Sequence, residues 1–234
     1  MAGNVPTRTT ERDAVETSGR DNADRLGGRL PLLDRADLDA EQQQVYEGLA
    51  RTVLPEAAES GFTARLDDGR FVGPFNAMLR VPNIAAGLGQ WTSQIARSGM
   101  ADDVRQVVIL TVGVAWSAEY EIDAHMSAAR VVGIPDRAIE AIVQGRAPQA
   151  VSDEAAVAYR LTNSLLIDHV VPDPLYRDAI ATFGAAGVIA ILCLIGQYQT
   201  ISSILVCFQV PVPERSDARQ QPEPAAPDRV GEDL

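Results

Sequence analysis

The segment GVIAILCLIGQYQTISSILVCF, residues 187–208, decides the fold class, because it is apolar on nearly every side when placed on a helix. Polar side chains interrupt it near the middle, at Gln197, Tyr198, Gln199, Thr200, Ser202 and Ser203. An unpaired polar group in a protein interior costs on the order of 1 to 3 kcal/mol, so these groups must find partners or face a cavity. We therefore expect the central helix of a bundle, or a helix at a subunit interface.

The rest of the central sequence has apolar residues at helical spacing and no alternating run that would favour a sheet. This spacing predicts helices over 38–52, 74–80, 83–99, 101–115, 118–132, 135–144, 152–168, 173–184 and 186–206. Ser117 and Ser152 are expected to cap the helices that follow them, Gly133 suits a helix exit, and Pro135 suits a first turn. The sequence predicts an all-α protein with a loop at 61–74.

The two ends of the chain differ from the middle in composition. Residues 1–28 are polar with mixed charge, and residues 211–234 combine proline with charge. Such segments bury too little apolar surface to offset the entropy of ordering, so we expect both to be disordered. Residues 29–210 are then predicted to form a single all-α domain.

The charge balance argues against several classes of partner. Twenty basic residues stand against 32 acidic ones, for a net charge of -12, which repels nucleic acid and anionic membranes. The first residues lack an apolar signal segment, and no stretch approaches the roughly 18 uninterrupted apolar residues of a membrane helix. We expect a cytoplasmic protein with a small-molecule substrate and no nucleic-acid or membrane partner.

Chemistry-bearing residues gather in SAEYEIDAHMSAAR, residues 117–130. Glu121 and His125 share one helix face at i, i+4 spacing, where a carboxylate can raise the proton affinity of an imidazole and fix its tautomer. A general base or acid working near neutral pH requires this, although the same spacing also fits a buried pair that only fixes helix packing. Glu119 in the first turn and Asp123 on another face are interpreted as structural.

A metal site has less support from the sequence. The pattern His-Glu-x-x-His is absent, and the only other histidine, His169, lies beyond a predicted helix end, where a cation is favoured by the helix dipole. Cys193 and Cys207 are fourteen positions apart in an apolar run and form no Cys-x-x-Cys pair. We predict no metal ligands and no cofactor.

Three blocks carry a resemblance to a known family: GRFVGPFNAMLRVPNIA (69–85), VVILTVGVAWSAEYEIDAHMSAARVVGIPDRAIEAI (107–142) and GVIAILCLIGQYQTISSILVCFQVPVP (187–213). Their order and spacing resemble those of the carboxymuconolactone decarboxylase family, which has an AhpD-like fold. Within that family they resemble a subgroup whose signature is Glu-Tyr-Glu followed by any three residues and then His. The resemblance covers residues 30–213. It implies an oligomeric helical bundle, as a trimer, a hexamer or a dimer, with the pocket near the helix that carries His125.

Alkylhydroperoxidases of the AhpD type share that fold and carry a Glu, then Cys-x-x-Cys, then a His four residues after the second Cys. Alignment on His125 puts Glu121 at the second Cys, Ala118 at the first and Gln106 at the upstream Glu. Peroxide reduction by that mechanism needs a thiolate and a resolving thiol, so we do not expect a peroxidase of this kind. A Glu and a His favour proton transfer instead.

Four further residues are candidates for substrate binding. Asn76 and Arg80 are four apart on a short predicted helix and suit a clamp for a carboxylate, although Arg80 also fits a plain charge at a helix end. Trp116 and Tyr198 are more consistent with packing than with contact to a substrate. Tyr198 lies in the polar break of the apolar helix.

The resemblance and the residues together predict a cofactor-independent lyase or isomerase. It would act by decarboxylation, dehydration or ring rearrangement on a small oxygenated acid, lactone or polyketide-like intermediate. His125 is expected to move the proton, and Glu121 to orient and charge the imidazole. Two alternatives stay open: a non-catalytic oligomeric binding or scaffold protein, and an oxidoreductase without the peroxidatic dithiol.

Overall fold

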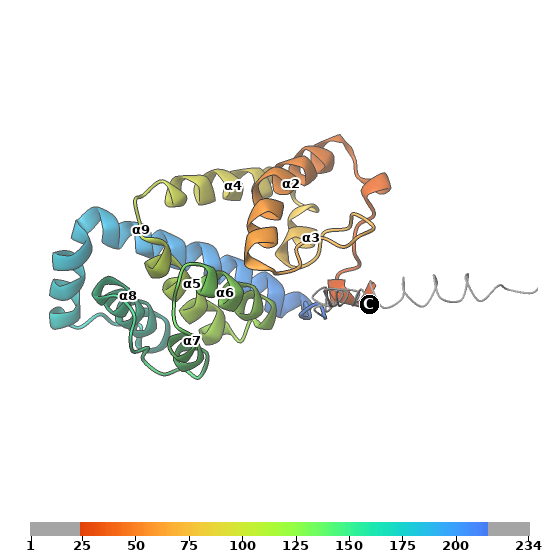
Figure 1. The fold of residues 1–234 in the computed structure, drawn as a ribbon. Coiled ribbons are helices and arrows are strands. Elements are labelled where there is room, and N and C mark those ends of the chain that lie inside the picture. Colours follow the sequence, from red (N-terminus) through yellow and green to blue (C-terminus); the bar gives the residue numbers. More distant parts are fainter. Residues whose placement is uncertain (1–23, 215–234) are drawn as a thin grey trace, which may run out of the picture.

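The computed structural model describes residues 24–214, and this part of the chain is helical, with one isolated bridge between Arg65 and Phe71 as its only extended pairing (Figure 1). The all-α prediction is therefore confirmed for the described residues. In chain order the elements are η1 (Arg25–Gly27), η2 (Arg35–Asp37), α2 (Ala40–Ser60), α3 (Pro74–Met78), α4 (Pro82–Ala96), α5 (Asp102–Trp116), α6 (Glu119–Val131), α7 (Asp136–Val143), α8 (Asp153–Asn163), η3 (Ser164–Asp168) and α9 (Asp173–Phe208).

Helix α5 is the centre of the fold. Its run VVILTVGV is apolar on all sides, and the helix is accordingly covered by α6, α7, α8 and α9. Most of its residues are buried: Val104, Gln106, Val107, Val108, Ile109, Leu110, Thr111, Val112 and Gly113. The main core therefore lies around α5, and the elements that pack on it are held in fixed positions.

Helix α9 runs along α5 and has two different faces. Leu194 and Ile195 are buried in the main core, whereas Ile189 and Leu192 on the other face are exposed. A kink at Gly184, with φ of 64°, separates the two segments that the sequence predicts as 173–184 and 186–206. By length and composition α9 is the one described helix that could cross a membrane, a test that the core helix of a soluble protein also passes.

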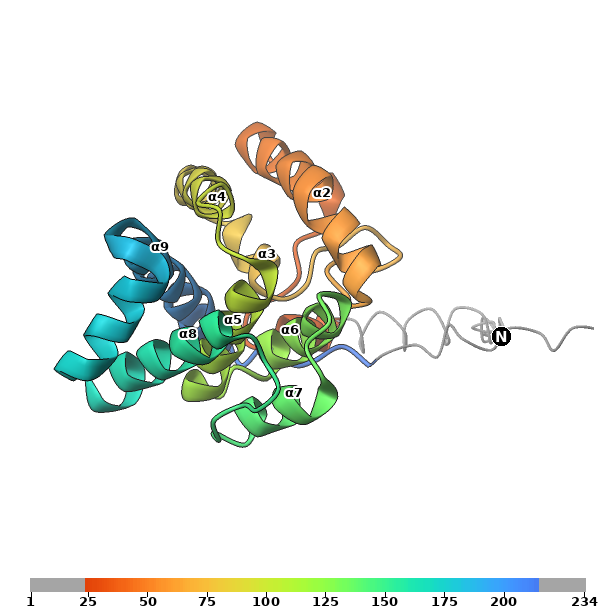
Figure 2. The ribbon, with the colours of Figure 1, turned by 60° about the vertical axis from the view of Figure 1, so that its left-hand side comes forward.

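Helices α2 and α4 lie on one side of α5 and α9, and α7 and α8 lie on the opposite side (Figures 1 and 2). Helix α4 is attached loosely, because Ile95 is its only buried residue. Helix α2 starts at a capping box formed by Asp39 and Gln42 and continues to Ser60, eight residues further than its predicted end. Residues of these two helices line a cleft together with residues of α6 and α9, and this cleft is where the candidate site lies.

The loop over 61–74 docks on α6 through one aromatic side chain. The Tyr120 hydroxyl donates a hydrogen bond to the Thr63 carbonyl oxygen at 2.7 Å. Gly73 makes this possible, since its φ is 65° and a Cβ there would lie 2.3 Å from the Tyr120 ring. The predicted loop is thus held against the helix that carries Glu121 and His125.

The helix ends differ from the sequence-based prediction at some positions. Ser152 caps α8 as predicted, by accepting a hydrogen bond from the Ala155 amide. Ser117 does not cap α6: it is the left-handed residue that ends α5, with φ of 53°. The predicted helix over 152–168 is α-helical only to Asn163 and then continues as a π-helical turn.

Residues 24–28 of the segment predicted to be disordered are among the described residues. Arg25–Gly27 form a short helix there, and Leu26 packs against a small cluster that contains Leu205 and Tyr120. Asp24 is also paired with Arg70. The remainder of the predicted N-terminal segment, and residues 215–234 of the predicted tail, lie outside the described residues.

Candidate active site

Glu121 lies in the first turn of α6 and is 3% exposed. Gly113 of α5 leaves the space for its side chain, because a Cβ at that position would lie 3.2 Å from Glu121 Oε1. The Ser202 hydroxyl of α9 is 3.0 Å from both carboxyl oxygens and donates to them. Burial raises the pKa of Glu121 to about 8, against a smaller lowering by the Ser202 hydrogen bond. At neutral pH this carboxyl group is therefore mostly protonated.

His125 lies one turn further along α6 and pairs with a different residue. Its Nδ1 is 2.9 Å from Oε1 of Gln106 on α5. Because an amide oxygen only accepts hydrogen bonds, Nδ1 carries the proton in this arrangement and Nε2 is left as the basic nitrogen. Burial lowers the pKa of His125 from 6.5 to about 4, so the imidazole is neutral at pH 7.

These partners correct one expectation. The i, i+4 spacing predicts that Glu121 raises the proton affinity of His125, but the carboxyl group bonds to Ser202 and the imidazole to Gln106. A carboxyl group that is itself neutral supplies no charge to stabilise an imidazolium. The two groups are thus a neutral acid and a neutral base, held on one helix by two different neighbours.

Tyr198 joins the same group from α9. Its ring meets the His125 ring edge to face, with centroids 5.2 Å apart and planes at 85°. Burial is the main cause that raises the pKa of Tyr198 above its ordinary value, and the negative charges of Glu121 and Glu56 add to it. The phenol therefore keeps its proton. The polar break of the apolar helix therefore packs the ring of a protonated tyrosine against the imidazole.

Glu121, His125 and Tyr198 line one cleft of about 1390 Å³. Its walls come from α2 and α4, and residues of α6 and α9 complete it. This volume exceeds the several hundred cubic ångströms of a usual ligand pocket. The cleft is large enough for a small organic substrate.

Three predicted binding residues lie outside the lining of this cleft. Asn76 is buried and holds the chain at its N-terminal side: its Nδ2 donates to the Leu30 carbonyl oxygen, and its Oδ1 accepts from the Leu33 amide, each at 3.1 Å. Arg80 donates to Asn76 Oδ1 at 2.9 Å and to the Pro31 carbonyl oxygen. The predicted carboxylate clamp is thus a structural anchor for residues 30–33.

Trp116 is also outside the cleft lining. It ends α5 and is 38% exposed. The sequence reasoning missed instead two residues that contact the site: Ser202, which bonds Glu121, and Gln197, which lines the cleft. Both are among the polar interruptions of the apolar helix, which is the signal that identifies them.

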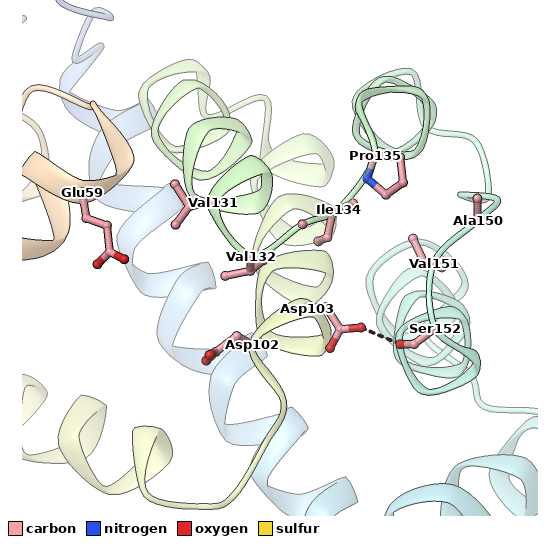
Figure 3. A pocket seen from close by; sticks show the side chains of 11 residues that line it. Glu59, Asp102, Asp103, Val131, Val132, Ile134, Pro135, Ala150, Val151 and Ser152 are labelled. Carbon is pink, nitrogen blue, oxygen red and sulfur yellow. Dashed lines mark hydrogen bonds between the residues drawn. The ribbon is translucent and has the colours of Figure 1, made fainter.

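A second cavity, of about 540 Å³, lies at the end of α6 (Figure 3). Its polar lining includes Asp103, whose Oδ2 accepts a hydrogen bond from Ser152 Oγ at 2.6 Å while Oδ1 accepts from the Val104 amide. These bonds hold the starts of α5 and α8. Within residues 24–214 there is no group of three or more His, Cys, Asp or Glu side chains placed to hold a metal ion.

Two solved structures share this arrangement of helices. One is a protein of unknown function from Agrobacterium tumefaciens, described as a putative antioxidant defence protein AhpD. It has a TM-score of 0.54 and 16% identity, and the match covers 59% of this chain and 96% of that one. The other is a variant of the debrominase Bmp8 in complex with 2,3,4-tribromopyrrole. It has a TM-score of 0.56 and 13% identity, and the match covers 80% of this chain and 92% of that one. The fold is AhpD-like. No family model and no curated protein matches the sequence.

Proposed function

We propose that this chain is a cofactor-independent lyase or isomerase that transfers protons on a small oxygenated acid, lactone or polyketide-like intermediate. One observation carries the proposal: two titratable groups in one cleft have pKa values displaced in opposite directions, Glu121 upward and His125 downward. Environments that separate the pKa values of neighbouring groups in this way are typical of paired acids and bases in enzymes.

The geometry favours a division of roles that differs from the one expected from the sequence. His125 is neutral and keeps Nε2 free, so it acts as the base that takes a proton from an acidic C–H bond. Glu121 is protonated, so it acts as the acid that returns a proton to the substrate. The electron pair of the broken C–H bond passes to an enolate oxygen, to which Tyr198 can donate a hydrogen bond. Exchange with water restores both groups.

The position of the two cysteines supports proton transfer over thiol chemistry. Cys193 and Cys207 are the only cysteines in the chain, and both are free. Both lie on α9 outside the lining of the cleft. A peroxidatic dithiol beside His125 would need two thiols in the positions of Ala118 and Glu121. The debrominase neighbour has the same fold and is an enzyme, which is compatible with catalysis here.

We test this function by the exchange of substrate protons with solvent. Wild-type protein in heavy water is incubated with a panel of small lactones and 3-oxo acids, and deuterium uptake at the acidic carbon is followed by NMR. His125→Gln is expected to slow uptake by about 10² or more, the usual scale of an acid or base effect, with the thermal midpoint little changed. His169→Gln is the matched control, because His169 is exposed, is not part of the cleft lining, and its Nδ1 contacts the Leu165 carbonyl oxygen.

Equal uptake in His125→Gln and wild type, or no uptake with any member of the panel, would contradict the proposal. A non-catalytic scaffold has one observation in its favour: Glu121 and His125 each have a hydrogen-bond partner within the chain. That alternative predicts that His125→Gln loses stability or assembly and that no member of the panel exchanges protons faster than it does without protein.

A further inference from the structure

Among the described residues that line the cleft, Gln197 has a buried side-chain oxygen with no hydrogen-bond partner. It is 3% exposed, and its Nε2 donates to Thr92 Oγ1 of α4 at 2.9 Å. The Thr92 hydroxyl in turn donates to the Leu88 carbonyl oxygen, so it has no proton to offer to Gln197. In this arrangement Oε1 of Gln197 is left buried without a partner among the described residues.

An unpaired buried acceptor in a lined cleft indicates a ligand that carries a donor. Leaving such a group unsatisfied costs on the order of 1 to 3 kcal/mol, which an O–H or N–H group of a bound molecule would recover. Gln197 Oε1 can only accept, so a carboxylate or an ether oxygen would not recover it. The acceptor therefore favours a hydroxyl, an enol or an N–H group on the ligand.

Two aromatic side chains, Trp91 and Tyr198, share the lining of the cleft with Gln197. Trp91 of α4 lines the cleft, is 40% exposed, and lies 3.7 Å from the position that a Cβ would take at Gly196. The ring of Tyr198 lies in the same lining. Planar surfaces of this kind stack well with planar rings.

We propose that Gln197 orients the substrate and that the cleft selects a planar ring bearing an O–H or N–H donor. The ring would lie between the side chain of Trp91 and the side-chain oxygen Oε1 of Gln197. This inference rests on the proposed function, because it names the substrate class of that same cleft. It narrows the oxygenated compounds of that function to planar ring compounds that carry an enol, a phenol or an N–H group. Gln197 is a binding residue, distinct from the acid and the base.

The test uses phenol and toluene as probes. They have nearly the same shape, but phenol carries a hydroxyl group where toluene carries a methyl group. The protein is the full chain with Trp116→Phe, which leaves Trp91 as its only tryptophan. Quenching of Trp91 fluorescence gives a dissociation constant for each probe. The measured quantity is the ratio of the toluene constant to the phenol constant. We expect Gln197→Met to lower this ratio by about three- to tenfold, the effect of one hydrogen bond.

Gln90→Met is the matched control, since Gln90 is exposed in the same cleft lining on α4 and should leave the ratio unchanged. An unchanged ratio in Gln197→Met, or failure of both probes to bind, would overturn the proposal. A change of oligomeric state in Gln197→Met would also overturn it, because the acceptor would then belong to a subunit contact. The binding measurement requires no catalytic turnover, and it is repeated in the His125→Gln variant. The proposed substrate class can therefore be rejected without rejecting the proton-transfer function, and the reverse also holds.

Discussion

Burial keeps the carboxyl group of Glu121 neutral, and this makes the stability of the protein fall as pH rises. Replacing Glu121 by a residue that does not ionise should remove this dependence. Its pKa is about 8 in the folded protein and 4.5 when exposed, so between these values the folded state binds more protons than the unfolded state. The free energy of unfolding must therefore fall as pH rises, by up to about 1.4 kcal/mol per pH unit. Glu121→Gln keeps a neutral side chain, and we expect it to abolish this fall.

Urea unfolding between about pH 6.5 and 8 measures the effect of Glu121→Gln. The lower limit matters, because His125 has the opposite shift, from 6.5 to about 4, and makes stability rise with pH only below its unfolded value. Glu119→Gln is the control, as an exposed carboxyl group in the same first turn. Parallel pH profiles for wild type and Glu121→Gln would show that Glu121 is ionised in the folded protein.

The spacing of residues predicted part of this site, and the rest depended on long-range contacts. Glu121 and His125 were identified because both lie within one helical segment, where the i, i+4 rule applies. Their partners Ser202 and Gln106 come from other helices, 81 and 19 residues away. Asn76 and Arg80 had the right spacing for a clamp, but the backbone at 30–33 occupies their donors. Local pattern shows which side chains share a face and not which segment packs against it.

At the scale of the elements, the boundary between α5 and α6 gives a prediction about Ser117. Its φ of 53° is unfavourable for a residue with a Cβ and favourable for glycine. Ser117→Gly is expected to raise the free energy of unfolding by about 0.5 to 1 kcal/mol, because it relieves this strain. Thermal or urea unfolding measures the change. The same substitution at Ser93, exposed within α4, should lower stability by about as much.

The outcome for Ser117→Gly also separates two interpretations of the helix ends. If Ser117 were the N-cap of α6, as the sequence predicts, glycine would cost a few tenths of a kcal/mol instead of stabilising. The helices themselves were predictable, because apolar residues recur at helical spacing from α2 to α9. The helix ends were harder to predict, because a serine between two helices can either end the first helix or cap the start of the second. Tertiary packing, here the burial of Ala118 beside Val72 and Tyr120, settles which it is.

At the scale of the whole molecule, the exposed apolar face of α9 predicts an assembly. Ile189 and Leu192 are 59% and 41% exposed on a helix whose opposite face forms the core. Contiguous apolar surface of this kind is uncommon on a monomer and typical of a contact with another subunit. We expect a homo-oligomer, and the double substitution Ile189→Glu and Leu192→Glu should dissociate it, since each introduced charge would have to be buried unpaired.

Sedimentation velocity distinguishes the two states of the double variant, with Ile167→Glu as the control. Ile167 is as exposed as Ile189 but lies on a different element, the π-helical turn η3. The control should keep the wild-type sedimentation coefficient while the double variant sediments more slowly. Circular dichroism of both variants should match wild type, because neither position is in the core. If the double variant keeps the wild-type coefficient, α9 does not form the contact, and its apolar face requires a different partner.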